Sequence, residues 1–285
     1  MLEAMRMLIA NRQGWSGTLM GIFVADEEAA SLGAKEYIKT APEIAYCMIG
    51  EPTTCTTVTA HKGSLRPVVR IHGKTAHSGM PHLGVNAILK STRLLELIIE
   101  EHEHLSKNSH DLVGNPSLTV THALGGHADN VVPQNCDFLL DRRMVPGEDE
   151  KAVKRDLEDL VKRAAKESGV EAEITEFRPT TGGATETDPN HPVVHASQHA
   201  CTQHNGKASP LSGFQGGCDL VHFRAVGANG IVLGPGSLNV AHQPNEFVPV
   251  DELMRSALIY HDVARSMLSN GAIPDTAAIA REYKS

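Results

Sequence analysis

Three consecutive carboxylates, Asp26, Glu27 and Glu28, follow directly on a short apolar run, residues 18–25. The run is rich in strand-forming residues and short enough to be a buried strand. In α/β proteins, ligands bind beyond the carboxyl ends of such strands. Adjacent carboxylates repel one another unless a cation or hydrogen bonds hold them, and a metal ion is the simplest remedy. The alternative is that they form the first turn of a helix over residues 29–40, where the helix dipole favours acids.

The composition excludes several classes of protein. The 285 residues carry a net charge of −8 and are 41% hydrophobic, so we expect a globular protein with no attraction to nucleic acid or to a membrane surface. No run is apolar enough to span a bilayer, and no signal peptide precedes the first predicted strand. The five cysteines include no CxxC pair, which is typical of reduced thiols in a cytoplasmic protein.

The first sixty residues predict one half of an α/β domain. A helix over residues 1–11 precedes the strand at residues 18–25, and residues 44–49 form a second buried strand. Strand, helix and strand in this spacing make a βαβ unit with parallel strands. Because parallel strands end at the same edge of a sheet, we expect Glu51, which follows the second strand, to lie near the acidic run.

The pattern changes at about residue 63 and predicts a second, smaller domain. Helical and strand patterns follow one another there in the order β-α-β-β-α-β, which is the ferredoxin-like split βαβ arrangement. The strands are expected at residues 65–72, 117–123, 137–143 and 171–177, and the helices at residues 85–104 and 148–168. This domain, residues 63–178, is expected to be inserted into a mostly parallel-sheet α/β domain.

Residues 179–270 return to the α/β domain that residues 1–62 began. The expected elements are helices at residues 192–203, 217–226 and 250–269 and a strand at residues 230–233. Glycines and prolines after that strand predict an irregular active-site loop, which contains His242. Residues 271–285 form a weakly determined tail.

Glu28, Glu51 and His242 are thus expected in loops that follow parallel strands. Carboxylate oxygens and an imidazole nitrogen suit Zn²⁺, with Mn²⁺ or Co²⁺ as substitutes. Glu27, adjacent to a ligand, could deprotonate a metal-bound water. Taken alone, His242 is more simply an ordinary loop residue; the convergence of the strand ends favours the metal site.

Other candidates lie outside these strand ends. His77, between a strand and a long helix, could stabilise an oxyanion, although a surface histidine in a turn has the same pattern. One of Arg142 and Arg143 could clamp a carboxylate, with the other solvated. Gly217, the second of a glycine pair, could present backbone donors to an anion. The HxD sequence at residues 127–129 has metal-ligand character, but it falls in the inserted domain and we interpret it as unrelated.

Taken in order, seven segments resemble the dinuclear-zinc amidohydrolases: VADEEAASLG, IGEPT, AHKG, GKTAHSGMPHLGVNAI, NVVPQNCDFLLDRR, GPGS and AHQPNEF. That family includes acetylornithine deacetylase, succinyl-diaminopimelate desuccinylase, aminoacylase and glutamate carboxypeptidase. The resemblance runs from residue 1 to about residue 268. It implies a zinc-dependent hydrolase that cleaves the amide bond of an N-acyl amino acid or short peptide, and a homodimer held by the inserted domain.

The resemblance also implies roles in proton transfer and metal binding. Glu27 resembles the general acid and base of the family. Glu28 and His242 resemble the ligands of one zinc ion, and Glu51 resembles a ligand of the other.

Four further residues are assigned to the site, His77 with a catalytic role and the other three with roles in substrate binding. His77 resembles the histidine that the dimerisation domain donates across the subunit interface to the active site. Arg143, with Asn130 upstream, resembles the groups that grip the substrate carboxylate. Gly217 lies in a glycine-led motif that we assign to substrate binding.

One departure from the family pattern separates two hypotheses. The family's first metal ligand is a histidine in an HxD motif on an early strand, and a later aspartate bridges the two metals; the sequence has neither motif ahead of its first predicted helix. It therefore resembles the family without its amino-terminal portion. The first hypothesis is a zinc-dependent amidohydrolase with an incomplete catalytic domain. The second is a non-catalytic homodimer that keeps the dimerisation domain, and metal content discriminates between them.

Overall fold

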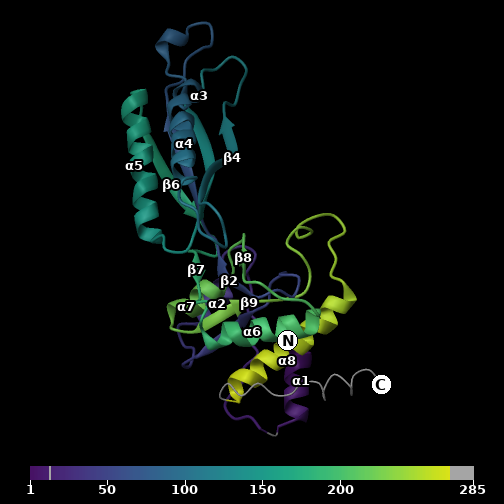
Figure 1. Cartoon of the computed structure of the whole chain (residues 1–285). Coiled ribbons are helices and arrows are strands. Elements are labelled where there is room, and N and C mark those ends of the chain that lie inside the picture. The colour runs from purple at the N-terminus through teal and green to yellow at the C-terminus, as the bar shows by residue number, and fades with distance from the viewer. Residues whose placement is uncertain (13, 270–285) are drawn as a thin grey trace. The chain divides into compact units, whose positions relative to one another are not determined.

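The computed structural model describes residues 1–12 and 14–269, which divide into two compact units, each with its own sheet (Figure 1). Among the described residues, unit 1 comprises residues 1–12, 14–27, 31–61 and 185–269, and unit 2 comprises residues 28–30 and 62–184. The predicted tail, residues 271–285, lies outside the described residues.

Unit 2 is built on a four-stranded antiparallel sheet. Its strands are β3 (Gly63–His72), β4 (Ser117–Gly125), β5 (Asn135–Met144) and β6 (Ala172–Arg178), in the spatial order β4-β5-β3-β6. All three neighbouring pairs are antiparallel. The unit therefore has the β-α-β-β-α-β order that the sequence pattern predicts.

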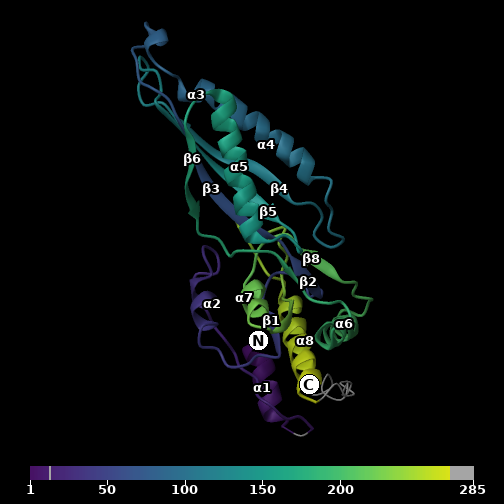
Figure 2. The same cartoon turned by 90° about the vertical axis from the view of Figure 1, so that its left-hand side faces the viewer.

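Two helices, α4 (Thr92–Leu105) and α5 (Glu150–Ser168), lie side by side over one face of this sheet (Figures 1 and 2). Aliphatic residues of both helices, including Leu94 and Leu157, are buried against strand residues such as Leu140. The predicted single helix over residues 85–104 is divided: a 3₁₀ turn, η1 (Pro81–Leu83), and the short helix α3 (Ala87–Lys90) precede α4.

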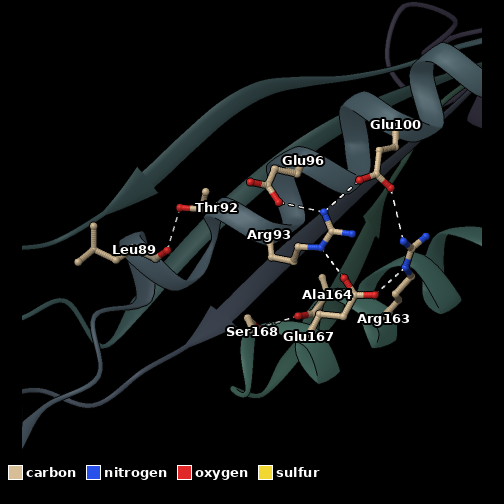
Figure 3. Close-up of polar contacts among 9 residues, drawn as sticks. All are labelled: Leu89, Thr92, Arg93, Glu96, Glu100, Arg163, Ala164, Glu167 and Ser168. Atoms are coloured by element: carbon tan, nitrogen blue, oxygen red, sulfur yellow. Dashed lines mark hydrogen bonds and ion pairs between the residues drawn. The ribbon is translucent and has the colours of Figure 1, made fainter.

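Charged side chains join the exposed surfaces of α4 and α5 (Figure 3). Arg93 donates from Nη1 to Glu96 at 2.9 Å and to Glu100 at 3.0 Å, and its Nε donates to Glu167. Arg163 donates to the same Glu167 at 2.8 Å. The hydrogen bonds from Arg163 and Arg93 lower the pKa of the Glu167 carboxyl. Exposed ion pairs contribute little one by one, so the network adds to helix packing that the buried residues already stabilise.

Unit 1 contains a mixed sheet with strands in the order β1-β9-β2-β7, and β8 also pairs with β2. The strands are β1 (Tyr46–Ile49), β2 (Val58–His61), β7 (Thr185–Glu186), β8 (Ser212–Phe214) and β9 (Asn229–Val232). The pairs β1–β9 and β2–β8 are parallel, whereas β2–β7 and β2–β9 are antiparallel. The expectation of a mostly parallel sheet is therefore wrong, because β2, which the sequence pattern missed, runs against β9.

The helices of unit 1 follow the predicted order, and two of them are shorter than expected. They are α1 (Leu2–Ala10), α2 (Leu32–Tyr37), α6 (Pro192–Asn205), α7 (Leu220–Ala225) and α8 (Val250–Leu268). The shorter helices are α2, which is six residues long where residues 29–40 were expected, and α7, which is six residues long where residues 217–226 were expected. Among the described helices of the whole chain, none is long and apolar enough to cross a membrane.

The apolar run at residues 18–25 is not a strand, and this prediction is wrong. Neither sheet includes it, and Phe23 is 71% exposed. A strand is stabilised by hydrogen bonds to neighbouring strands, and β1 pairs only with β9 within residues 1–12 and 14–269. The run therefore lacks the partner strand that the predicted βαβ unit required.

Candidate functional site

The acidic run forms a compact turn that ends just before α2. Asp26 and Ser31 both have positive φ, +68° and +54°, and Ser31 N donates to the Asp26 carbonyl at 2.7 Å. Gly33 N donates to the Ala25 carbonyl at 3.0 Å, and a Cβ at Gly33 would lie 2.5 Å from Ala25 N. Only glycine fits there. The carboxylates thus do not end a strand, and they lie before the first turn of α2, where Asp26 Oδ2 accepts a hydrogen bond from Leu32 N at 3.3 Å.

Glu51 follows β1 and lies at the carboxyl edge shared by β1 and β9. The loop after β1 is hydrogen-bonded to the loop after β9: Gly234 N donates to Thr53 Oγ1 at 3.1 Å, and Cys55 N donates to the Gly234 carbonyl at 2.8 Å. A Cβ at Gly234 would lie 2.5 Å from the Glu51 carbonyl oxygen, so the two loops are in close contact. Convergence at a parallel strand edge is therefore present, with β9 in the place expected for residues 18–25.

The loop after β9 carries His242 on an exposed turn. His242 has φ +59°, and its backbone N–H donates to Glu246 Oε2 at 2.9 Å. The same loop lines a shallow pocket beside Glu51. The pocket is lined by Pro52, Pro235, Gly236, Ser237, Glu246, Phe247 and Val248.

Glu27, Glu51 and the glycine pair of unit 1 gather around Cys218. Cys218 is fully buried immediately after Gly217 and shortly before α7. Burial raises the pKa of its thiol well above the ordinary value, and the nearby carboxylates of Glu51, Glu27 and Asp219 raise it further. A thiol of this kind stays protonated and is not a nucleophile. The structure therefore brings Glu27 and Glu51 to one region, next to Gly217.

The predicted zinc ligands do not form a recognisable metal group. Within residues 1–12 and 14–269, no cluster of three or more His, Cys, Asp or Glu side chains is arranged to hold a metal ion. Glu51 and His242 lie on loops of unit 1, whereas Glu28 belongs to the short segment grouped with unit 2. We therefore assign no catalytic step to a metal ion at these residues.

In unit 2, His77 and Asn130 are neighbours. His77 pairs with Val131 in an isolated bridge, and Ser78 N donates to the Asn130 carbonyl at 2.9 Å. His77 Nδ1 accepts a hydrogen bond from Gly79 N at 3.0 Å, so the proton of the neutral ring is on Nε2. Both side chains are exposed. His77 therefore has an N–H donor on an exposed side chain.

Arg143 lies at the other end of the same sheet. On β5, Asn135 pairs with His72 and Arg143 pairs with Ser64. At roughly 3.3–3.4 Å per residue, these two ends of β5 are about 27 Å apart. His77 and Asn130 lie beyond the Asn135 end, so one copy of unit 2 does not bring them together with Arg143.

The arginine pair divides differently from the prediction. Arg142 is 4% exposed and donates to Glu148 and to the Arg143 carbonyl, so the expectation that one of the pair is solvated is wrong. Arg143 Nε donates to Asp141 Oδ1 at 2.6 Å, and Arg66 donates to the other oxygen at 3.2 Å. Sequence reasoning missed Asp141. The available signal was a carboxylate on the inward-facing side of a strand, two residues before an arginine.

Comparison with known proteins places this architecture. Residues 59–169 match the family described as the peptidase dimerisation domain. The acetylornithine deacetylase of Vibrio vulnificus is 34% identical over 256 residues, which cover 85% of this chain and 64% of that protein. The acetylornithine deacetylase of Myxococcus xanthus is 33% identical over 252 residues, covering 86% and 64%.

Solved structures show the same fold at lower identity. An aminopeptidase of Bacillus cereus superposes with a TM-score of 0.71 at 22% identity, over 92% of this chain and 67% of that chain. A dinuclear metal binding peptidase of the M20 family from Bacillus subtilis gives 0.69 at 17% identity, over 94% and 70%.

The fold is that of an α/β protein with an inserted domain that matches the peptidase dimerisation domain. More specifically, the chain is similar to acetylornithine deacetylases over about 85% of its length, and residues 59–169 match the peptidase dimerisation domain. It spans about 64% of the length of the curated relatives described above.

Proposed function

We propose that the protein is a metal-dependent hydrolase of the amide bond of an N-acyl amino acid or short peptide. The observation that carries the proposal is the gathering of Glu27, Glu51 and Gly217 around Cys218, in a chain whose 30–34% identical relatives are acetylornithine deacetylases. Zinc is the proposed cofactor, with Co²⁺ or Mn²⁺ as substitutes, and Glu28, Glu51 and His242 remain its proposed ligands. When bound, such an ion would lower the pKa of a water molecule.

The chain's own residues have separate proposed roles. Glu27 accepts the proton of the attacking water and returns it to the leaving amine. His77 donates its Nε2 proton as a hydrogen bond to the oxyanion. Arg143 and Asn130 hold the substrate carboxylate, and the backbone N–H groups near Gly217 assist in binding it.

The test is hydrolysis of N²-acetylornithine, other N-acetylated amino acids and a tripeptide by the purified chain supplied with Zn²⁺ or Co²⁺. Turnover of one of these classes supports the proposal. No turnover of any of them, with the chain folded and dimeric, supports the non-catalytic alternative.

We further propose that the protein works as a homodimer in which His77 of the partner subunit, with the partner's Asn130, completes each site. The separation of about 27 Å along β5 is the reason, because it places His77 and Arg143 of one copy in different sites. A two-fold axis through an interface of unit 2 would exchange them between copies.

Edge strand β4 is the surface we assign to this dimer. Its nine residues, SLTVTHALG, contain no Asp, Glu, Lys or Arg, whereas the opposite edge, β6, contains Glu173, Glu176 and Arg178. Charged side chains protect exposed edges from pairing, and β4 lacks them. Leu124 on β4 and Leu89 on the neighbouring α3 are 74% and 71% exposed. An uncharged edge with adjacent apolar side chains fits a second copy of itself.

We expect Leu89→Glu combined with Leu124→Glu to weaken the dimer at least about tenfold, since burying two new charges opposes association. Sedimentation velocity over a range of concentrations measures the dissociation constant. Leu32→Glu, which charges a 61% exposed leucine of unit 1, is the matched control and should leave the constant unchanged. A wild-type chain that stays monomeric at tens of micromolar, or a double variant that dimerises normally, contradicts the assignment.

The second candidate function is a non-catalytic homodimer that retains the dimerisation domain. The observation that favours it is the lack of a three-residue metal group among the described residues. A catalytic zinc uses about three protein ligands, and the chain offers three candidates in all. We therefore expect fewer than two zinc ions per chain by elemental analysis and calorimetry. Two tightly bound ions per chain would contradict this expectation and exclude the non-catalytic alternative.

A further inference from the structure

Helix α6 carries two exposed histidines that the proposed function does not use. The buried side of α6 includes Val194, Ala200 and Cys201 and packs in the core of unit 1, where α6 lies against α8 (Figures 1 and 2). His195 and His199 are on the exposed side. Among the described residues, neither imidazole side chain has a hydrogen bond, ion pair or ring contact. Both imidazoles are therefore available to an external ligand.

The spacing of this pair is that of a chelating site. Residues four apart on an α-helix are neighbours on one face, with Cβ atoms about 5–6 Å apart. Two histidines in this relation bind one metal ion in the helical zinc motif of metalloproteases. The spacing is set within α6 itself, so it does not depend on any other element of the fold.

The helix holds the pair on a firm scaffold. His191 is the N-cap and accepts a hydrogen bond from Val193 N at 3.3 Å, Pro192 occupies the first turn, and Gly206 ends the helix in the left-handed conformation. The other histidine of the helix, His204, is hydrogen-bonded to Asp262 at 2.7 Å. Both flanking histidines are thus engaged in the fold, which leaves His195 and His199 as the chelating pair.

We propose that His195 and His199 form a surface site for one divalent transition-metal ion, separate from the proposed zinc site. Imidazole nitrogens suit Cu²⁺, Ni²⁺ and Zn²⁺, and the general order of affinity places Cu²⁺ first. Two protein ligands leave the remaining coordination positions open to water or to a second, external ligand. The net charge of −8 favours the approach of a cation.

The test uses the full chain and the probe Cu²⁺–iminodiacetate. Iminodiacetate fills part of the coordination shell of Cu²⁺ and leaves positions that two imidazoles can occupy. The probe therefore does not bind at sites that require the ion without its chelator. We expect one probe per chain, with two nitrogen donors from imidazole in its electron paramagnetic resonance spectrum. His195→Ala and His199→Ala should each weaken binding of the probe at least about tenfold. Removing a residue that hydrogen-bonds to a metal ligand already weakens metal binding by this much, and removing the ligand itself costs at least as much.

The matched control is His102→Ala combined with His104→Ala. These exposed histidines on α4 are two residues apart and do not face one another, so their removal deletes as many imidazoles without deleting a chelating pair. Binding equal to wild type in this variant, and its loss in His195→Ala/His199→Ala at unchanged circular dichroism, supports the site. Retained binding in the latter variant, or a wild-type chain that binds no probe, overturns it.

Discussion

Glu27→Gln is expected to lower kcat for hydrolysis of an N-acetylated amino acid by roughly 10²–10⁴, the usual contribution of a general base. Glutamine keeps the size of the side chain and its place in the turn after Asp26, but it cannot accept the proton of the attacking water. The half-buried Glu27 shares its surroundings with Glu51 near Cys218, so the lost carboxylate lies in the proposed site. Steady-state kinetics with the metal-supplied chain measure the effect.

Two further variants separate proton transfer from other effects. Glu36→Gln removes the same charge from exposed α2, where Glu36 pairs only at the surface with Lys39, and should change kcat less than about twofold. Glu28→Gln should instead reduce metal content, since Glu28 is a proposed ligand. If Glu27→Gln lost its metal and Glu28→Gln kept it, the two roles would be reversed.

Unit 2 was predictable from sequence because its signals are local and long. The pattern of α5 continues through nineteen residues, and its ends carry their own signals: Asp149 accepts a hydrogen bond from Ala152 N at 2.8 Å, and Gly169 adopts φ +69°. Each strand of the antiparallel sheet is seven to ten residues long. Such lengths allow periodicity to be read directly.

Unit 1 was less predictable because its sheet depends on short segments and distant partners. Strands β2, β7 and β8 have four, two and three residues, too few to show alternation. Residues 18–25 had the composition of a strand, but composition does not supply a hydrogen-bonding neighbour. Strand β9 takes the place that was expected for residues 18–25 beside β1. Glu51 still lies at the carboxyl edge of the sheet, because any parallel neighbour of β1 ends at that edge.

The candidate site was likewise predictable only in part. The position of Glu51 followed from strand direction, and the pairing of His77 with Asn130 brings together two residues that sequence reasoning selected separately. The separation of both from Arg143 was not predictable, since it depends on the antiparallel register of β3 with β5. The burial of Arg142 depended on Glu148, six residues later, which the sequence did not mark as its partner.

The separation of His77 from Arg143 along β5 leads to a prediction that distinguishes a site shared by two subunits from a site contained in one chain. His77→Ala removes a proposed oxyanion donor and should lower kcat about 10²–10³-fold. Arg143→Ala removes a charged hydrogen-bond donor to the substrate and should lower kcat/KM at least about tenfold. If each site takes His77 from the partner subunit and Arg143 from its own chain, a heterodimer of the two variants contains one intact site and one site that lacks both groups.

We therefore expect the purified heterodimer, co-expressed with two affinity tags, to recover about half of the wild-type activity, since one of two symmetric sites is restored. The matched control pairs His77→Ala with Asn130→Ala. These two residues are neighbours at the same end of unit 2, so each site of that heterodimer lacks one of them and no recovery is expected. No recovery with Arg143→Ala would show that His77 and Arg143 of one chain serve the same site, which would require a conformation of unit 2 that removes the distance along β5. Recovery in the control would show that His77 and Asn130 of one chain serve different sites, which contradicts the arrangement proposed here.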